Sequence, residues 1–346
     1  MDPKTAHTGM VKSPGSPEWN KEGLQFGICE KCHADVTEKF GKSLHYTLNG
    51  QVNSMVAYSH KGVLEEGPNA ITKGFELDCN ECHSECGGCH VSRPSSQKGG
   101  LLSGHKFEKQ PPMEKTCVGC HSTRNGGEFI GNVGPTADTH YYDFDMVCTD
   151  CHPESNFHGT GELPENMHVT EDMPTCISAK CHTDVMSKEK GIEMHLAHGD
   201  QNLLSCSTCH SAEANGCSDC HVAYKDAKKD SIVPSSKVIS AFKIAKNPNP
   251  TKLHPFKYIT VRHMPMLKDT LAGMDYPILE GFDSISNWKE SPTHNTQKNT
   301  IQNAKCNSCH GVEKLFLTKG DLLPGDSKAS LDYVVPEIPK VLKEEK

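Results

Sequence analysis

The stretch Cys79–His90 reads CNECHSECGGCH and contains two C-x-x-C-H units separated only by Ser84 and Glu85. In such a unit the two thiols add across the vinyl groups of a porphyrin, and the histidine that follows ligates the iron. Each unit therefore predicts one covalently attached c-type haem. His83 and His90 lie seven residues apart, so even an extended chain keeps these two ligands within roughly 25 Å. That spacing suits electron transfer from iron to iron.

The same unit recurs along the chain. Six further copies follow the pattern, and a ninth, CISAKCH at Cys176–His182, has four residues between its thiols instead of two. The predicted attachment cysteines are Cys29, Cys32, Cys79, Cys82, Cys86, Cys89, Cys117, Cys120, Cys148, Cys151, Cys176, Cys181, Cys206, Cys209, Cys217, Cys220, Cys306 and Cys309. The predicted proximal iron ligands are His33, His83, His90, His121, His152, His182, His210, His221 and His310. Nine units use all 18 cysteines, which leaves none for a disulfide or a free catalytic thiol.

Other cysteine chemistries explain this pattern less well. Paired C-x-x-C motifs also build zinc and iron–sulfur sites, and an even cysteine count in an exported protein often means disulfides. None of these requires a histidine directly after the second cysteine. With 21 histidines among 346 residues, chance does not account for nine such placements. We therefore favour nine c-type haems.

The composition supports a fold built on these cofactors. Only 35% of the residues are hydrophobic, the mean hydropathy is -0.58, and the chain holds 29 Gly and 21 Pro. Side chains alone would form a small core for this length. Porphyrins would supply the missing apolar surface. We expect a multihaem cytochrome fold of mostly irregular coil with short α-helices and few strands, wrapped around a closely packed chain of haems, with a short helix leading out of the first motif at Cys29–Phe40.

Charge and hydropathy narrow the range of partners. The formal net charge is -8, and every haem would add two propionates. This balance disfavours nucleic acid and anionic membrane surfaces. No run of 18 apolar residues predicts a membrane span.

The cofactor also predicts a location. Covalent haem attachment takes place outside the cytoplasmic membrane, so we expect an exported protein. Residues 1–10 (MDPKTAHTGM) lack the basic and apolar regions of a signal peptide, and we interpret the sequence as a mature form. The expected location is extracellular or at the cell surface, with the periplasm as the alternative.

Cysteine density divides the chain into four segments. Residues 1–28 form a polar leader that we expect to be extended. Residues 29–221 form a haem-dense region with eight motifs. Residues 222–305 lack cysteine, and we expect a lobe that donates ligands, with strands in 231–245 and 253–266; an accessory domain is the alternative. Residues 306–346 hold the last motif and a charged tail.

The sixth ligand of each iron decides between an electron carrier and an enzyme, because a second histidine saturates the iron and leaves only electron transfer. Twelve histidines lie outside the motifs, three more than nine haems need. His195 and His198 are three residues apart, on one face of a helix, where each would reach a different haem. The nine predicted distal ligands are His45, His60, His105, His140, His158, His195, His198, His263 and His294. The reserve is His7, His168 and His254.

The chain resembles the multihaem c-type cytochromes of bacteria and archaea that respire metals or exchange electrons with protein partners. The resemblance covers residues 29–310 and rests on short segments: CHSECGGCHVSRP, GHKF at 104–107, DTHYYD at 138–143, HLAH at 195–198 and RHMP at 262–265. Some members of this class polymerise into filaments, the cytochrome nanowires, in which a histidine of one subunit ligates a haem of the next. That resemblance implies a homopolymer, with His7 as one candidate for the inter-subunit ligand.

Two classes of function remain open. The first is an electron carrier that passes electrons to partner cytochromes or extracellular acceptors, either as the subunit of a conductive filament or as a discrete shuttle. The second is a reductase of nitrogen or sulfur oxyanions with one open haem. Such enzymes often replace the histidine of the catalytic motif, whereas all nine motifs here end in histidine. We therefore favour the carrier over the enzyme.

Overall fold

The computed structural model describes residues 26–63, 66, 69, 71–72, 84–94, 97–104, 106–122, 125–132, 136–170, 172–178, 180–198, 202–212, 223–224, 232–233 and 242–343. The chain divides into two compact units, each assembled from separate segments. The first unit comprises Met1–Val52, Cys79–Ser122 and Met146–Met173, and the second comprises Asn53–Asp78, Thr123–Asp145 and Pro174–Lys346. Both units thus take residues from the predicted haem-dense region.

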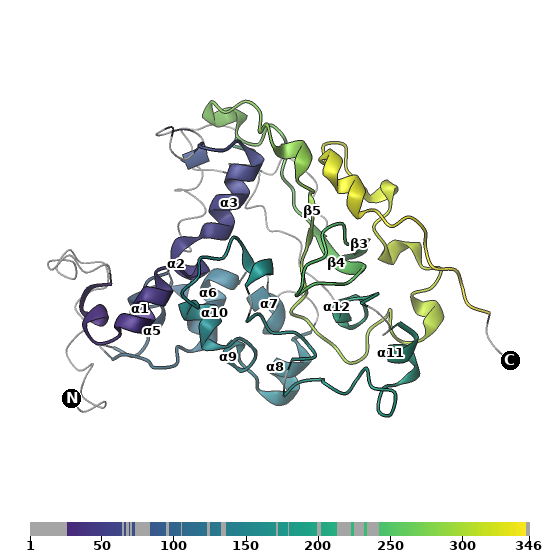
Figure 1. Ribbon diagram of the computed structural model, residues 1–346, viewed down its shortest axis with the longest axis horizontal. Helices are drawn as coiled ribbons and strands as arrows, with labels where there is room; N and C mark the ends of the chain where they lie inside the picture. The colour runs from purple at the N-terminus through teal and green to yellow at the C-terminus, as the bar shows by residue number, and fades with distance from the viewer. Residues whose placement is uncertain are drawn as a thin grey trace. The chain divides into compact units, whose positions relative to one another are not determined.

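Regular structure in the described residues is limited to short elements, which Figure 1 shows. The first unit holds η2 (Gly27–Lys31), α1 (Ala34–Phe40), α2 (Leu44–Thr47), α5 (Cys86–His90), η6 (Met113–Lys115), α6 (Cys117–His121), α9 (Cys148–Cys151), α10 (Glu154–His158) and η7 (Met167–Val169). Asn49–Tyr58 forms α3, the longest described helix. The second unit holds α7 (Asn125–Phe129), α8 (Thr139–Phe144), α11 (Glu193–His198), α12 (Cys206–His210) and six 3-10 helices: η8 (Ala272–Met274), η9 (Phe282–Ser284), η10 (Cys306–Ser308), η11 (Glu313–Leu315), η12 (Lys319–Asp321) and η13 (Lys328–Tyr333). No helix of the described ranges is long and apolar enough to cross a membrane.

The motifs themselves form single helical turns. α5, α6 and α12 each begin at the first cysteine of a motif and end at its histidine. Residues three apart lie on the same face of a helix, so both thiols of a C-x-x-C pair point to one side. The longer motif does not form a helix; there, the His182 amide donates to the Cys176 carbonyl at 2.9 Å.

Close packing in the first unit depends on one glycine. α10 ends at Gly159, which has a φ of 80°. A Cβ on this residue would lie 2.6 Å from the Lys39 carbonyl oxygen, closer than van der Waals contact allows. Glycine therefore permits both the backbone turn and the approach of α10 to α1. Phe40 of α1 lies 6.4 Å from the ring of His158.

The second unit contains the sheet. β4 (Tyr258–His263) pairs antiparallel with both β3 (Lys243–Lys246) and β5 (Trp288–Glu290), and β1 (Ala223–Tyr224) pairs with β2 (Ile232–Val233). β2 and β4 lie within the two runs predicted as strands, and β3 starts within the first of them. The buried residues Ala245, Ile259, Val261, Trp288 and Leu317 form an apolar cluster around the sheet.

One haem motif is attached directly to this sheet. α12 lies beside β4 in Figure 1, and the Ser205 amide donates to the Tyr258 carbonyl at 3.0 Å immediately before the helix begins. The hydroxyls of Ser207 and Thr260 form a second link at 3.0 Å. The sheet therefore fixes the position of the Cys206–His210 motif.

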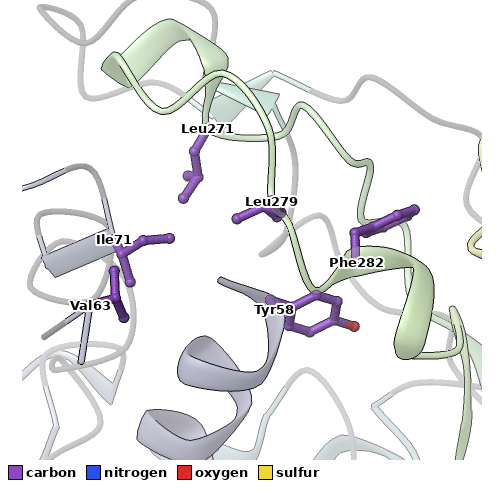
Figure 2. Close-up of a cluster of buried hydrophobic side chains, with 6 residues drawn as sticks. All are labelled: Tyr58, Val63, Ile71, Leu271, Leu279 and Phe282. Carbon is purple, nitrogen blue, oxygen red and sulfur yellow. The ribbon is translucent and has the colours of Figure 1, made fainter. Parts of the chain in front are cut away.

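A second apolar cluster joins the end of α3 to residues 271–282. Figure 2 shows its six buried members, which are Tyr58, Val63, Ile71, Leu271, Leu279 and Phe282. Val63 and Leu279 are completely buried. Among its described residues, the second unit thus has two apolar clusters that include no cysteine or histidine of a C-x-x-C-H motif.

Candidate functional site

Seven of the nine motifs fall within the described residues, and none of their cysteines forms a disulfide there. The predictions for Cys79, Cys82, His83, Cys217, Cys220, His221, His105 and His7 lie outside the described residues. The candidate site therefore consists of seven motif histidines and of the histidines outside the motifs, called loose histidines below.

Five loose histidines lie opposite five different motif histidines. Each contact joins one predicted distal ligand to one predicted proximal ligand, and no histidine is used twice. The ring centroids are 6.3 Å apart for His45 and His121, 6.1 Å for His158 and His90, 6.0 Å for His140 and His182, 6.0 Å for His195 and His210, and 6.0 Å for His198 and His310.

These separations have a simple chemical meaning. A metal–imidazole bond is about 2 Å long, and the ring centroid lies about 1 Å behind the bonding nitrogen, so two imidazoles on opposite faces of one iron have centroids roughly 6 Å apart. The five pairs match this value. They fit the two axial ligands of a haem whose attachment cysteines lie in the same motif as one of the rings.

Short helices present the distal rings. His45 is on α2, His140 on α8 and His158 on α10. α11 carries both His195 and His198, which face two different motif histidines. The predicted arrangement of these two histidines on one helix is confirmed, while their ligation of iron stays a prediction.

Hydrogen bonds at Nδ1 orient many of these rings. An Nδ1–H that donates to an oxygen fixes the tautomer and leaves the lone pair on Nε2, the arrangement usual for metal-bound histidine. Carbonyl oxygens of Glu108, Gln297 and Lys340 accept from His90 at 2.7 Å, His210 at 3.0 Å and His310 at 3.0 Å. Among the distal candidates, His198 donates to the Met194 carbonyl at 3.1 Å, His140 to Asp138 at 2.8 Å and His158 to Glu154 at 3.2 Å. His152 also has an Nδ1 partner, the Asn156 side-chain oxygen at 3.0 Å.

Two predicted distal ligands use the other nitrogen. Nε2 of His60 bonds to Glu66 at 2.7 Å, and Nε2 of His263 bonds to Asp326 at 2.7 Å. An Nε2 engaged with a carboxylate must change its partner before it ligates iron, so ligation by His60 and His263 stays a prediction.

The remaining candidates are placed as follows. The His294 amide donates to Glu128 at 3.0 Å, the reserve residue His254 bonds to Glu290 through Nδ1 at 2.7 Å, and the His168 amide donates to Asn166 at 2.9 Å.

The pair His45 and His121 combines two imidazoles whose pKa values are lowered. Burial first, and then the neighbouring His121 charge, lowers the pKa of His45 to about 4; burial, and then His152, also lowers the pKa of His121. His45 Nδ1 is buried and has no hydrogen-bond partner among the described residues. Both imidazoles are therefore neutral at pH 7, which is the form that binds a metal.

Thiols of different motifs lie in contact. The Cys86 side chain is hydrogen-bonded to Cys29 and lowers the pKa of that thiol to about 7. Cys148 makes the same contact with Cys117, and Cys176 makes it with Cys206. These contacts lower the pKa of the Cys117 thiol and of the Cys206 thiol to about 7. Porphyrins bonded to touching thiols would lie next to each other.

Exposed apolar side chains surround the motifs. Tyr142 and Phe144 of α8 are 77% and 68% exposed, Ile177 lies inside the longer motif, and Ile192 and Leu196 accompany the distal histidines of α11. Large apolar side chains in such numbers normally contact something. A porphyrin plate beside each motif fits them. Among the described residues no group of three or more His, Cys, Asp or Glu would hold a bare metal ion.

Sequence reasoning missed the groups that orient the rings. Backbone carbonyls such as those of Glu108, Gln297 and Lys340 have no signature in the sequence. Phe107 stacks on His90 at 4.6 Å, and only its position close to a motif could have suggested it.

No protein-family model, no curated protein and no solved structure matches this chain.

Proposed function

We propose that this protein transfers electrons over distance through nine covalently bound c-type haems with histidine on both axial faces. The observation that carries the proposal is the set of five facing histidine pairs, each formed from one motif histidine and one loose histidine. Such a pair would saturate the iron of a haem held between its two rings. The bound haem then supplies reversible one-electron chemistry, and the chain's part is to hold the two imidazoles and exclude other ligands.

Contacts between motifs support passage of electrons from haem to haem. In the first unit, thiol contacts link the motifs of His33 and His90, and those of His121 and His152. In the second unit they link the motifs of His182 and His210. The two haems at each contact would be neighbours, and each such pair would form one step of an electron path.

The finer proposal is a subunit of an extracellular conductive filament, and a discrete shuttle is the alternative. It rests on the resemblance to filament-forming cytochromes and on the expected export of a haem-bearing chain. Other copies of this chain would then be the partners, with cytochromes or extracellular acceptors at the ends of the path.

The experiment combines spectroscopy and microscopy of one purified native sample. We expect a reduced absorption spectrum that carbon monoxide does not change, and ordered fibres in electron micrographs. Discrete particles with the same spectrum would support an electron carrier that acts as a discrete shuttle and would exclude the filament. A carbon monoxide-sensitive fraction near one haem in nine would mean an open iron, and a reductase would replace the carrier.

A further inference from the structure

The end of the chain packs against the last haem motif. Residues 339–342, the C-terminal segment, make four hydrogen bonds to residues 307–311. The Lys340 carbonyl accepts from His310 Nδ1 at 3.0 Å, and the Pro339 carbonyl accepts from the Gly311 amide at 2.7 Å. The Asn307 side chain donates to the Leu342 carbonyl at 3.0 Å and accepts from the Leu342 amide at 2.8 Å.

This segment reaches the motif from a fixed point. Val335 is buried with Ile244 and Phe316, and Ile338 and Cys309 pack against the same cluster. The Val335 amide also donates to the Leu317 carbonyl at 2.9 Å. The backbone is thus anchored at Val335, five residues before Lys340, whose carbonyl contacts His310.

The motif accommodates the segment through a glycine. Gly311 has a φ of 80°, and a Cβ there would collide with the Val341 side chain. The Val341 side chain covers Gly311 on one side of Lys340, and the Pro339 carbonyl accepts from the Gly311 amide on the other, so the Lys340 carbonyl between them has little freedom to move away from His310. The ring that His310 faces, His198, is also held by a carbonyl, that of Met194.

We propose that the C-terminal segment is the positioning element of the His310 haem: it sets the plane of the proximal imidazole and the electron density that this ligand gives to iron. The proposal rests on the proposed function, since it requires a haem at Cys306 and Cys309. A hydrogen bond from Nδ1–H to a carbonyl makes an imidazole more basic. A more basic ligand favours Fe(III) in the one-electron Fe(III)/Fe(II) couple, so the segment lowers the potential of this haem.

The first test uses the haem-loaded protein with Asn307→Ala. This change removes both side-chain contacts to Leu342 and keeps every cysteine and histidine. We expect one haem in nine to change its electron paramagnetic resonance signal, because the His310 ring turns from its present angle of 52° to His198. The midpoint potential of that haem should rise in a potentiometric titration. The other eight haems should stay unchanged.

Two truncations form a matched pair for the same measurements. Ending the chain after Ile338 removes the segment, whereas ending it after Leu342 removes only residues 343–346. The shorter chain should show the altered resonance signal and the longer one should match the full chain. The midpoint potential is compared only between the full chain and Asn307→Ala. In the chain that ends at Ile338, water would also reach the haem, and greater exposure to water lowers the midpoint potential.

The failure of this inference is distinct from the failure of the proposed function. Mass spectrometry of the unaltered protein counts the haems, and a count of zero would remove both proposals. With nine haems present, unchanged signals in both Asn307→Ala and the chain that ends at Ile338 would overturn the role of the segment alone.

Discussion

At the scale of single residues, the nitrogen that a histidine uses gives a way to rank the predicted distal ligands. Rings that face a motif histidine mostly bond through Nδ1, whereas His60 and His263 bond carboxylates through Nε2. The sequence shows only that twelve histidines are available for nine positions. Which nitrogen is engaged depends on neighbours distant in the chain, so the sequence alone could not rank these candidates.

This difference predicts opposite results for two histidine substitutions. His158→Ala should open one iron, because its ring faces His90 across 6.1 Å. In the reduced protein, we expect carbon monoxide to bind about one haem in nine. His60→Ala is the matched control and should bind none. Binding in the His60 variant but not in the His158 variant would show that the nitrogen in use does not identify the ligands.

Another residue-scale prediction concerns a buried ion pair in the second unit. Arg262 donates to both carboxylate oxygens of Glu128, at 2.5 and 2.9 Å, and the two side chains are 4% and 0% exposed. Arg262→Met leaves a buried carboxylate without its cation, and we expect a loss of about 3–5 kcal/mol in the free energy of unfolding. Denaturant titration followed by circular dichroism measures the change.

The control for that prediction is an exposed pair of the same unit. Lys268 bonds Asp283 at 2.8 Å, but both side chains are largely in water, where ion pairs contribute little. Lys268→Met should leave the unfolding midpoint nearly unchanged. Equal losses in the two variants would mean that burial does not decide the energy of the Arg262 pair.

At the scale of elements, local patterns predicted some structure and tertiary contacts determined the rest. The helix predicted at Cys29–Phe40 is found as η2 and α1, with a break at Cys32 and His33. β5 was not predicted, because three residues around Trp288 carry no alternating pattern and pair only through β4. The contacts of the C-terminal segment were not predicted either, since each of the four uses a backbone group of that segment, which carries no signature in the sequence.

One element, α11, predicts a pair of independent effects. His195 faces His210 and His198 faces His310. Each single alanine substitution should therefore open a different haem, and the double variant should bind carbon monoxide at two haems in nine. If the double variant binds only one equivalent, both histidines serve the same iron, and the assignment of α11 to two motifs is wrong.

At the scale of the whole molecule, the described residues differ in how far their large apolar side chains are buried. Residues 242–343 contain the sheet cluster and half of the buried residues in Figure 2. In 139–198, nine large apolar side chains are exposed, among them Tyr142 and Ile192, and none is part of the two clusters. Stability of the motif-bearing segments should then come from bound haem, because a ligand that binds only the folded chain stabilises it.

Limited proteolysis with and without haem attachment tests this division. The haem-loaded protein should resist cleavage in both units, since covalent porphyrins bury the apolar side chains near the motifs. The chain made without haem should be cut first in 139–198, where α8, α11 and the longer motif lie, while residues 242–343 persist longest because their cores need no cofactor. Mass spectrometry of the fragments gives the cleavage sites. If residues 139–198 resist proteolysis equally with and without haem, side chains alone stabilise this region. The porphyrins would then not be its core.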